Sequence, residues 1–162
     1  MSVPAWARGK SKSQYIFETY MLNIRIGQIV MSKPKKYREN YGDHVIRTAL
    51  DALKFCQAAN AIYMSQNTSE EDYRRRKSYL TNALAYIDHI STVADIFLGL
   101  NYNMDGAKQE QIDRQEEYIG STCKMIHDLI RGVIDSDARI FKGEKEVRTP
   151  CKPPNAVKRK QK

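Results

Sequence analysis

The feature that most constrains this chain is a long apolar stripe with helical spacing near its centre. Its members follow at steps of four, three, four, three and four residues: Leu80, Leu84, Ile87, Ser91, Ala94 and Leu98. Because an α-helix has 3.6 residues per turn, such steps place side chains on one face. The stripe therefore predicts a long amphipathic helix that buries this face against neighbours and runs to residue 100.

Three other segments repeat the same period. Apolar side chains recur at three- and four-residue steps in residues 13–31, 41–65 and 107–141, and no segment reads convincingly as a strand. The second of these stripes is rich in alanine, so a neighbouring helix can approach it closely. We therefore expect four helices, over residues 13–31, 41–65, 68–100 and 107–141.

Local signals indicate where these helices begin and end. Ser13 is the expected N-cap of the first helix, and Pro34 stops that helix because proline has no N–H to donate. Thr68 and Glu71 have the spacing of a capping box, in which the threonine accepts from an early backbone N–H and the glutamate reaches back. Residues 101–107 contain an Asp-Gly pair and predict a turn.

Four helices of this length bury their stripes most simply as an antiparallel up-down-up-down four-helix bundle, so the predicted fold class is all-α. A chain of 162 residues suits one such domain with short extensions. Gly120 and Gly132 lie inside the fourth helix, where each costs about 1 kcal/mol relative to alanine. They suggest close packing or a bend at these positions.

Charge is distributed unevenly along the chain. The 27 Lys and Arg residues exceed the 19 Asp and Glu residues by a net charge of +8. Residues 142–162 hold eight basic and two acidic residues, or +6, and residues 1–12 add +3, which leaves −1 for residues 13–141. We expect a basic N-terminal arm (1–12), a nearly neutral bundle (13–141) and a basic, flexible tail (142–162).

Cations nevertheless gather at two places within the bundle. One is the connection after the first helix and the other is an unbroken run in the third helix: Lys33, Lys35, Lys36 and Arg38, then Arg74, Arg75, Arg76 and Lys77. Such clusters favour polyanions, because binding releases condensed counterions. The alternative is a solvated surface, on which cations pair with acidic residues four positions away, such as Asp43, Asp51 or Glu70.

The sequence lacks the motifs of catalysis and of metal binding. Di-iron bundles need Glu-x-x-His pairs, and His44, His89 and His127 all lack a glutamate three positions earlier. There is no glycine-rich phosphate loop, nucleophile elbow or paired zinc signature. Cys123 and His127 share a helix face, but no third group is indicated that would orient them as nucleophile and base. We expect neither enzymatic activity nor a bound metal or cofactor.

A cytoplasmic location is the default expectation. Asp88, His89 and Asp95 interrupt the most apolar stretch, so we expect no membrane span. No apolar segment of a secretory signal follows the basic residues near the N-terminus. The three cysteines are odd in number and far apart, which fits reduced thiols better than disulfides.

Several short motifs lie between residues 3 and 141. In chain order they are Val3-Pro4 with Arg8, Thr48-Ala49-Leu50-Asp51-Ala52-Leu53 with Cys56 and Ala59-Asn60, Tyr73-Arg74-Arg75-Arg76, and Ile130-Arg131 with Ser136-Asp137-Ala138-Arg139. This set resembles the accessory variability determinants, which are the four-helix-bundle accessory proteins of diversity-generating retroelements. They belong with the bundle proteins encoded in ribosomal-RNA intervening sequences.

The resemblance implies a non-enzymatic subunit that assembles as a ring, typically a homopentamer, and binds nucleic acid and a partner reverse transcriptase. In such systems the reverse transcriptase copies a template RNA with errors at adenines, and the accessory bundle is needed for cDNA synthesis. On that model the best candidates for phosphate contacts are Arg47, Lys54, Arg74, Arg75, Arg76 and Lys77, with Lys33, Lys35, Lys36 and Arg38 next. Arginine suits this role because its planar fork pairs two phosphate oxygens.

A second hypothesis remains open, in which the chain is a scaffold or interaction bundle of phage or intervening-sequence origin with no specific nucleic-acid role. On the first hypothesis, Arg47 and Lys54 share a helix face and extend a basic stripe if the start of the third helix packs nearby. No recognition-helix or RNP-type arrangement indicates sequence-specific reading of RNA or DNA.

Overall fold

The computed structural model describes residues 13–105 and 109–143. All regular structure within these residues is helical, which confirms the all-α prediction. Four long helices make up most of it: α1 (Gln14–Met31), α3 (Asp43–Asn60), α4 (Glu70–Asp105) and α5 (Gln109–Phe141). The predicted arm (1–12) and all but the first two residues of the predicted tail (142–162) lie outside the described residues.

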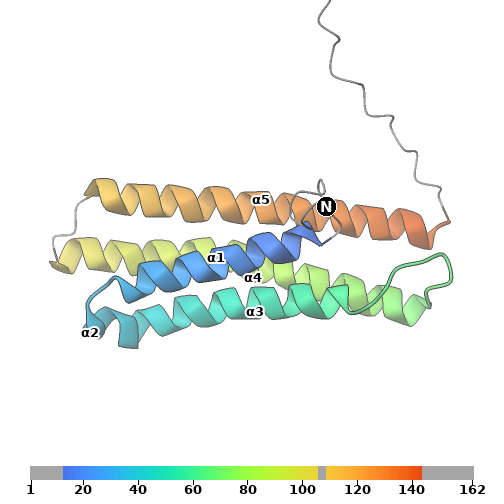
Figure 1. Ribbon diagram of the computed structural model, residues 1–162, viewed down its shortest axis with the longest axis horizontal. Coiled ribbons are helices and arrows are strands. Elements are labelled where there is room, and N and C mark those ends of the chain that lie inside the picture. The colour runs from blue at the N-terminus through green and yellow to red at the C-terminus, as the bar shows by residue number, and fades with distance from the viewer. Residues whose placement is uncertain (1–12, 106–108, 144–162) are drawn as a thin grey trace, which may run out of the picture.

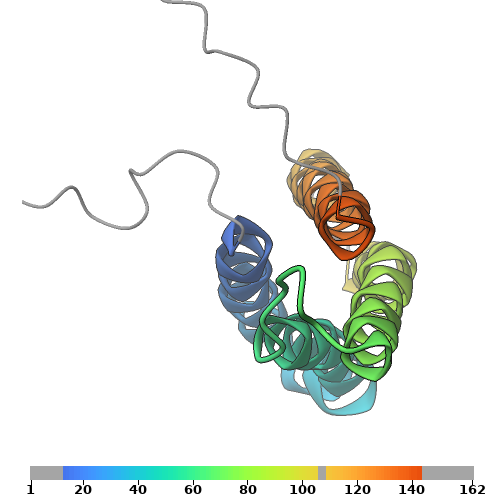
Figure 2. The same cartoon turned by 90° about the vertical axis from the view of Figure 1, so that its right-hand side faces the viewer.

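The four long helices lie side by side along the length of the molecule (Figure 1). Seen end-on, α1, α3, α4 and α5 follow one another around the molecule in chain order (Figure 2), and α1 also contacts α5. The turn that joins α1 to α3 lies at one end of the molecule, together with the end of α4 and the start of α5 (Figure 1). The connection 61–69 lies at the other end.

The predicted apolar stripe of α4 forms the centre of the core. Leu80, Ile87 and Leu98 are fully buried, and α3 meets this stripe with its small residues, among them Ala49 and Ala52. Burial of one large aliphatic side chain contributes about 1.5–3 kcal/mol, so this stripe contributes substantially to stability. It fixes which faces of the helices remain outside.

The sequence predicts no membrane span, and one segment of α4 bears on this prediction. By length and composition alone, Glu70–Leu100 is apolar enough to cross a membrane. The apolar side chains concerned, such as Ile90 and Phe97, are packed inside the bundle. Because a core helix passes the same test, one such helix is weak evidence for a membrane span.

The connection after α1 is largely helical. Pro34 follows α1 as expected, but its carbonyl accepts from the N–H of Tyr37 at 3.0 Å and so starts a new turn. The helix α2 (Lys35–Tyr37) leads into a π-helical turn, η2 (Arg38–Gly42), and then into α3. Gly42 is required here, because a Cβ at this position would lie 2.5 Å from Cγ1 of Val30.

The connection between α3 and α4 is longer than predicted. The N-cap of α4 lies one residue later than the predicted Thr68. α3 ends at Asn60 rather than at residue 65. The hydroxyl of Ser69 accepts from the Asp72 N–H at 3.1 Å and donates to the Asp72 carboxylate at 2.9 Å. Thr68, the predicted cap, instead accepts from the Ser65 N–H at 2.8 Å within the connection. Ser69 and Asp72 therefore form the start of α4.

The structure bears on three further expectations. α4 continues to Asp105, so most of the predicted turn 101–107 is helical. Gly120 and Gly132 stand in open space, with nothing from other segments within 4 Å of a Cβ built at either position, so close packing does not explain them and the bend stays a prediction. Ser13 is the N-cap residue of α1 as predicted, although its side chain makes no capping hydrogen bond.

Candidate nucleic-acid interface

Arg76, in the middle of the predicted basic run, is buried with only 6% of its surface exposed. Its Nε donates to Oδ2 of Asp137 at 2.6 Å, and its Nη1 donates to the carbonyls of Ala59 at 2.5 Å and Ile62 at 2.8 Å. Ala59 lies in the last turn of α3 and Ile62 just beyond it, in the region where helix carbonyls have fewer backbone partners. The guanidinium is therefore occupied inside the protein, and this geometry does not display Arg76 to a phosphate as expected.

Consecutive residues on a helix are rotated by about 100°, so a run of four cations cannot all face the solvent. Arg76 is the member that points into the core, and its partner Asp137 is also buried, on α5. The run of four cations does not by itself indicate that Arg76 is buried. The signal lies in the spacing, because Arg76 stands four residues before Leu80, the first member of the apolar stripe.

A second group of buried polar atoms lies between α1 and α3. The hydroxyl of Tyr15 donates to the carbonyl of Cys56 at 3.4 Å, and Thr19 donates to the carbonyl of Tyr15 at 2.6 Å. Burial raises the pKa of Tyr15 to about 12, against the opposing effect of the Arg76 charge. Burial also raises the pKa of the Cys56 thiol to about 11, and a hydrogen bond with Thr19 acts in the opposite direction.

The arginines before Arg76 are exposed and paired. Arg74 Nη2 lies 2.5 Å from Glu70 Oε1, and Arg75 Nη2 lies 2.6 Å from Glu71 Oε1. These are the i,i+4 pairs of the solvated-surface interpretation. Exposed pairs of this kind contribute only about 0.3–0.5 kcal/mol, so a phosphate can take the place of either carboxylate at small cost.

On α3, two more predicted cations lie on the exposed face. Arg47 pairs with Asp43, with 2.8 Å between Nε and Oδ2 and 75% of the arginine side chain exposed. The ammonium of Lys54 lies 5.9 Å from the ring centroid of Phe55. Lys77, on α4, is also exposed.

The start of α4 packs against the end of α3, which is the condition for a continuous stripe of cations. Phe55 on α3 contacts Tyr79 on α4 with 6.3 Å between ring centroids. Arg75 stands one helical turn before Tyr79 and so lies on the same side of α4. We use the name cationic stripe for four of the five exposed cations of these two helices, all but Lys77: Arg47, Lys54, Arg74 and Arg75.

The other predicted cluster lies at the opposite end of the bundle, beside α2 (Figure 1). Lys33 is largely buried, and its ammonium donates to Oε1 of Gln115 on α5 at 3.1 Å. Burial lowers the pKa of Lys33. Lys33 therefore holds α1 to α5, and the structure does not bring the two predicted clusters together.

The remaining members of this cluster are more exposed. Lys35 lies 3.6 Å from Glu39, and the Lys36 ammonium lies 4.7 Å from the ring centroid of Tyr37. Arg38 donates to the sulfur of Met31 at 3.7 Å, while its Nε is buried without a hydrogen bond to any described residue. The described contacts of Lys35, Lys36 and Arg38 are with residues close to them in the sequence, and these cations do not form an extended row.

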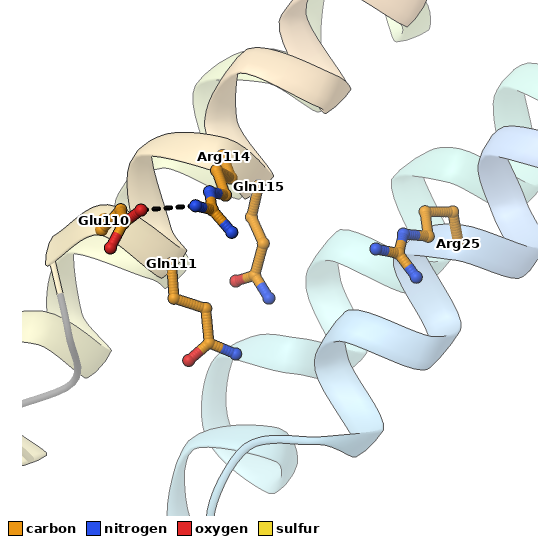
Figure 3. A pocket seen from close by; sticks show the side chains of 5 residues that line it. All are labelled: Arg25, Glu110, Gln111, Arg114 and Gln115. Atoms are coloured by element: carbon orange, nitrogen blue, oxygen red, sulfur yellow. Dashed lines mark hydrogen bonds and ion pairs between the residues drawn. The ribbon is translucent and has the colours of Figure 1, made fainter.

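A further group of cations, which the sequence analysis missed, lies between α1 and α5. A pocket of about 440 Å³ is lined there by Arg25, Glu110, Gln111, Arg114 and Gln115. Figure 3 shows Arg25 on α1 pointing toward Gln115 on α5, and Arg114 paired with Glu110. Only tertiary packing joins these segments, so nothing local in the sequence could reveal the group.

The three histidines lie between helices. The rings of His44 on α3 and His89 on α4 meet edge to face with centroids 5.9 Å apart. His127 on α5 has Nε2 3.9 Å from Asp88 on α4 and Nδ1 3.7 Å from Asp128. Among residues 13–105 and 109–143, no three His, Cys, Asp or Glu side chains group in a way that could hold a metal ion.

Cys123, which shares a helix face with His127, is buried in the core. Burial raises the pKa of this thiol to about 12, and the nearby charges of Asp88 and Asp95 add to the effect. A thiol held in its protonated form is a poor nucleophile. Burial therefore argues against a role for Cys123 and His127 as nucleophile and base.

Comparisons with known proteins gave no match: no family model, no curated protein and no solved structure is similar to this chain. The candidate interface is therefore defined by its own geometry.

Proposed function

We propose that the chain is a non-enzymatic nucleic-acid-binding accessory subunit of a diversity-generating retroelement. In this proposal it binds template RNA or cDNA and a partner reverse transcriptase in the cytoplasm, and it supports mutagenic cDNA synthesis. The body is an antiparallel up-down-up-down bundle that assembles with further copies into a ring, with five as the expected number. The resemblance of residues 3–141 to the accessory variability determinants supports this reading.

The single observation that carries the proposal is the cationic stripe. Arg47 and Lys54 stand seven residues apart, or about 10 Å along α3, on its exposed face. Arg74 and Arg75 stand near the start of α4, which packs against α3, and their side chains are 75% and 51% exposed. A rigid row of exposed cations can contact successive phosphates of one strand without reading its bases.

A salt titration tests the proposal. We expect the logarithm of the affinity for single-stranded and structured RNA to fall linearly with the logarithm of the salt concentration, because each phosphate contact releases a counterion. Arg74→Ala with Arg75→Ala should weaken binding and reduce the slope by about 2, or about 1 per lost contact. The matched control is Lys124→Ala with Arg131→Ala, which removes the same charge from exposed positions of α5 and should leave the slope unchanged.

Deletion of residues 142–162 separates the body from its basic extension. The proposal expects the shortened chain to retain salt-dependent binding that responds to Arg74 and Arg75. If the shortened chain binds no RNA at low salt, or if the α5 control weakens binding as much as the stripe variant, the cationic stripe is not the binding site.

A specific observation also favours the second candidate function, a scaffold or interaction bundle. The outer face of α1 exposes apolar side chains at helical spacing, between 40% and 64% exposed: Phe17, Tyr20, Met21, Ile24 and Met31. Contiguous exposed apolar surface of this kind marks a protein contact. A scaffold should show no nucleic-acid binding beyond that of the basic extension, so the same titration separates the two functions.

A further inference from the structure

A pocket of about 400 Å³ opens at the end of the bundle where α3 ends and α4 begins. Its inner wall contains the buried pair Arg76 and Asp137, and its outer residues include Asn60 and Tyr63. Ile62 adds an apolar surface. The volume falls within the range of roughly 300–1,000 Å³ that is typical of small-molecule sites.

The ion pair retains hydrogen-bonding capacity toward this pocket. Arg76 uses Nε and Nη1 in its contacts, and Asp137 uses Oδ2. Within the part of the chain that the structure describes, Nη2 of Arg76 and Oδ1 of Asp137 have no hydrogen-bond partner, and neither has the side-chain amide of Asn60. The pocket therefore offers a donor beside an acceptor at its inner wall, with an adaptable amide nearer the solvent.

An aromatic ring stands at the same opening. Tyr63 is 85% exposed, more than any other large hydrophobic side chain of the described residues. Exposed aromatic rings beside cationic grooves are the stacking surfaces of single-strand-binding proteins, since every base has a π-face. Tyr63 lies in the connection 61–69, at the end of the bundle where α4 begins, and Arg74 and Arg75 stand in the second turn of α4.

We propose that this pocket takes one unpaired nucleobase of a single strand whose phosphates lie on the cationic stripe. Tyr63 stacks on the base, and Arg76 and Asp137 meet its Watson–Crick edge, where every base carries a donor beside an acceptor. A base in a duplex has this edge occupied, so the site selects single-stranded over double-stranded nucleic acid. The inference rests on the proposed function and adds the ligand class that the stripe alone does not specify.

The test compares two single-stranded probes, an oligouridylate and an abasic phosphodiester backbone of equal length, by fluorescence anisotropy at one salt concentration. We expect Tyr63→Ala to weaken binding of the oligouridylate about 5- to 100-fold and to leave the abasic probe unchanged. Tyr63→Phe keeps the ring and should restore the affinity. Tyr41→Ala, which removes a half-exposed tyrosine from η2 at the other end of the bundle, is the matched control and should change neither probe.

The outcomes distinguish the inference from the proposed function. If wild-type protein binds both probes equally and Tyr63→Ala changes neither, the pocket is not a base site, while the cationic stripe remains a phosphate site. Equal affinity for the oligouridylate and for its duplex with oligoadenylate would also overturn the inference. If neither probe binds at low salt, both the inference and the proposed function fail. Circular dichroism of each variant verifies that the helices are intact.

Discussion

Arg76 on α4 and Asp137 on α5 form a buried ion pair, with 2.6 Å between Nε and Oδ2 and with less than one tenth of each side chain exposed. The same guanidinium donates hydrogen bonds to the backbone carbonyls of Ala59 and Ile62. Three separate stretches of the chain therefore meet at one side chain.

Removal of either partner should destabilise the fold strongly, because it leaves a buried charge without compensation. We expect Arg76→Ala or Asp137→Asn to lower the free energy of unfolding by about 3–5 kcal/mol in urea denaturation. Arg74→Ala, which breaks an exposed pair, should change it by no more than about 0.5 kcal/mol. A loss below about 1 kcal/mol for Arg76→Ala would contradict the described role of the guanidinium.

Gly42 should tolerate alanine poorly, because the added Cβ meets Cγ1 of Val30 at 2.5 Å. Overpacking of this kind costs about 1–3 kcal/mol. The control is Gly132→Ala at an exposed position of α5 with open space around it, where we expect a gain of up to about 1 kcal/mol from helix propensity. Thermal unfolding of the two variants checks the opposite signs, and equal shifts would contradict the close approach of η2 to α1.

The buried thiols should make the protein lose stability at alkaline pH. Burial raises the pKa of Cys56 from 9.0 to about 11 and that of Cys123 from 9.0 to about 12, so the unfolded chain releases these protons first. Stability is fully present below pH 9 and falls as the pH rises above it, by up to about 1.4 kcal/mol per pH unit for each thiol.

Urea denaturation under reducing conditions between pH 8 and 10.5 measures this slope. Cys123→Ala should reduce the slope by the share of one thiol, whatever its effect on stability at neutral pH. Tyr15, whose pKa rises from 10.0 to about 12, adds its own loss above pH 10. An unchanged slope in Cys123→Ala would show that this thiol does not titrate differently in the folded protein.

The proposed homo-oligomer should depend on the outer face of α1. We expect wild-type protein to show an oligomeric mass by light scattering and Ile24→Glu to reduce it to that of one chain, because a carboxylate in an apolar contact is costly to desolvate. Ile96→Glu, at a 57% exposed isoleucine of α4, is the control and should leave the mass unchanged. A monomeric wild-type protein would remove self-assembly from the proposed function.

The sequence predicts the long helices, but the stripe that it predicts for α1, through Tyr20, Ile24 and Met31, is exposed in the structure. Leu22, Ile26 and Ile29 are buried instead. The sequence also does not predict the contacts that end the helices. The period of Leu80, Ile87 and Leu98 predicts their burial because one helix face must leave the solvent, and this pattern is local. The end of α3 at Asn60 depends on Arg76, which lies on the next helix, and no local signal carries that information. Lys33 appears in the sequence as one more surface cation, yet its burial follows from Gln115 on α5.

Part of the candidate site can be predicted from local spacing, and part of it depends on packing between distant segments. Arg47 and Lys54 could be placed on one face from their spacing alone, and the structure leaves both exposed. The pocket beside Tyr63 could not be anticipated, since its residues come from the ends of three helices and a connection. The pocket between Arg25 and Gln115 is equally a product of packing between α1 and α5.

The π-helical turn η2 has a consequence for the angular phase of everything that follows it. A π turn winds one residue more than an α turn into about the same rotation, so a single-residue deletion that returns Arg38–Gly42 to α geometry leaves α3 near its present angle. The same deletion inside α3 would rotate the residues beyond it by about 100° and turn Ala52 and Cys56 out of the interior. The π turn is therefore the place in this segment where the chain length can change by one residue while Val45 and Ala49 stay buried.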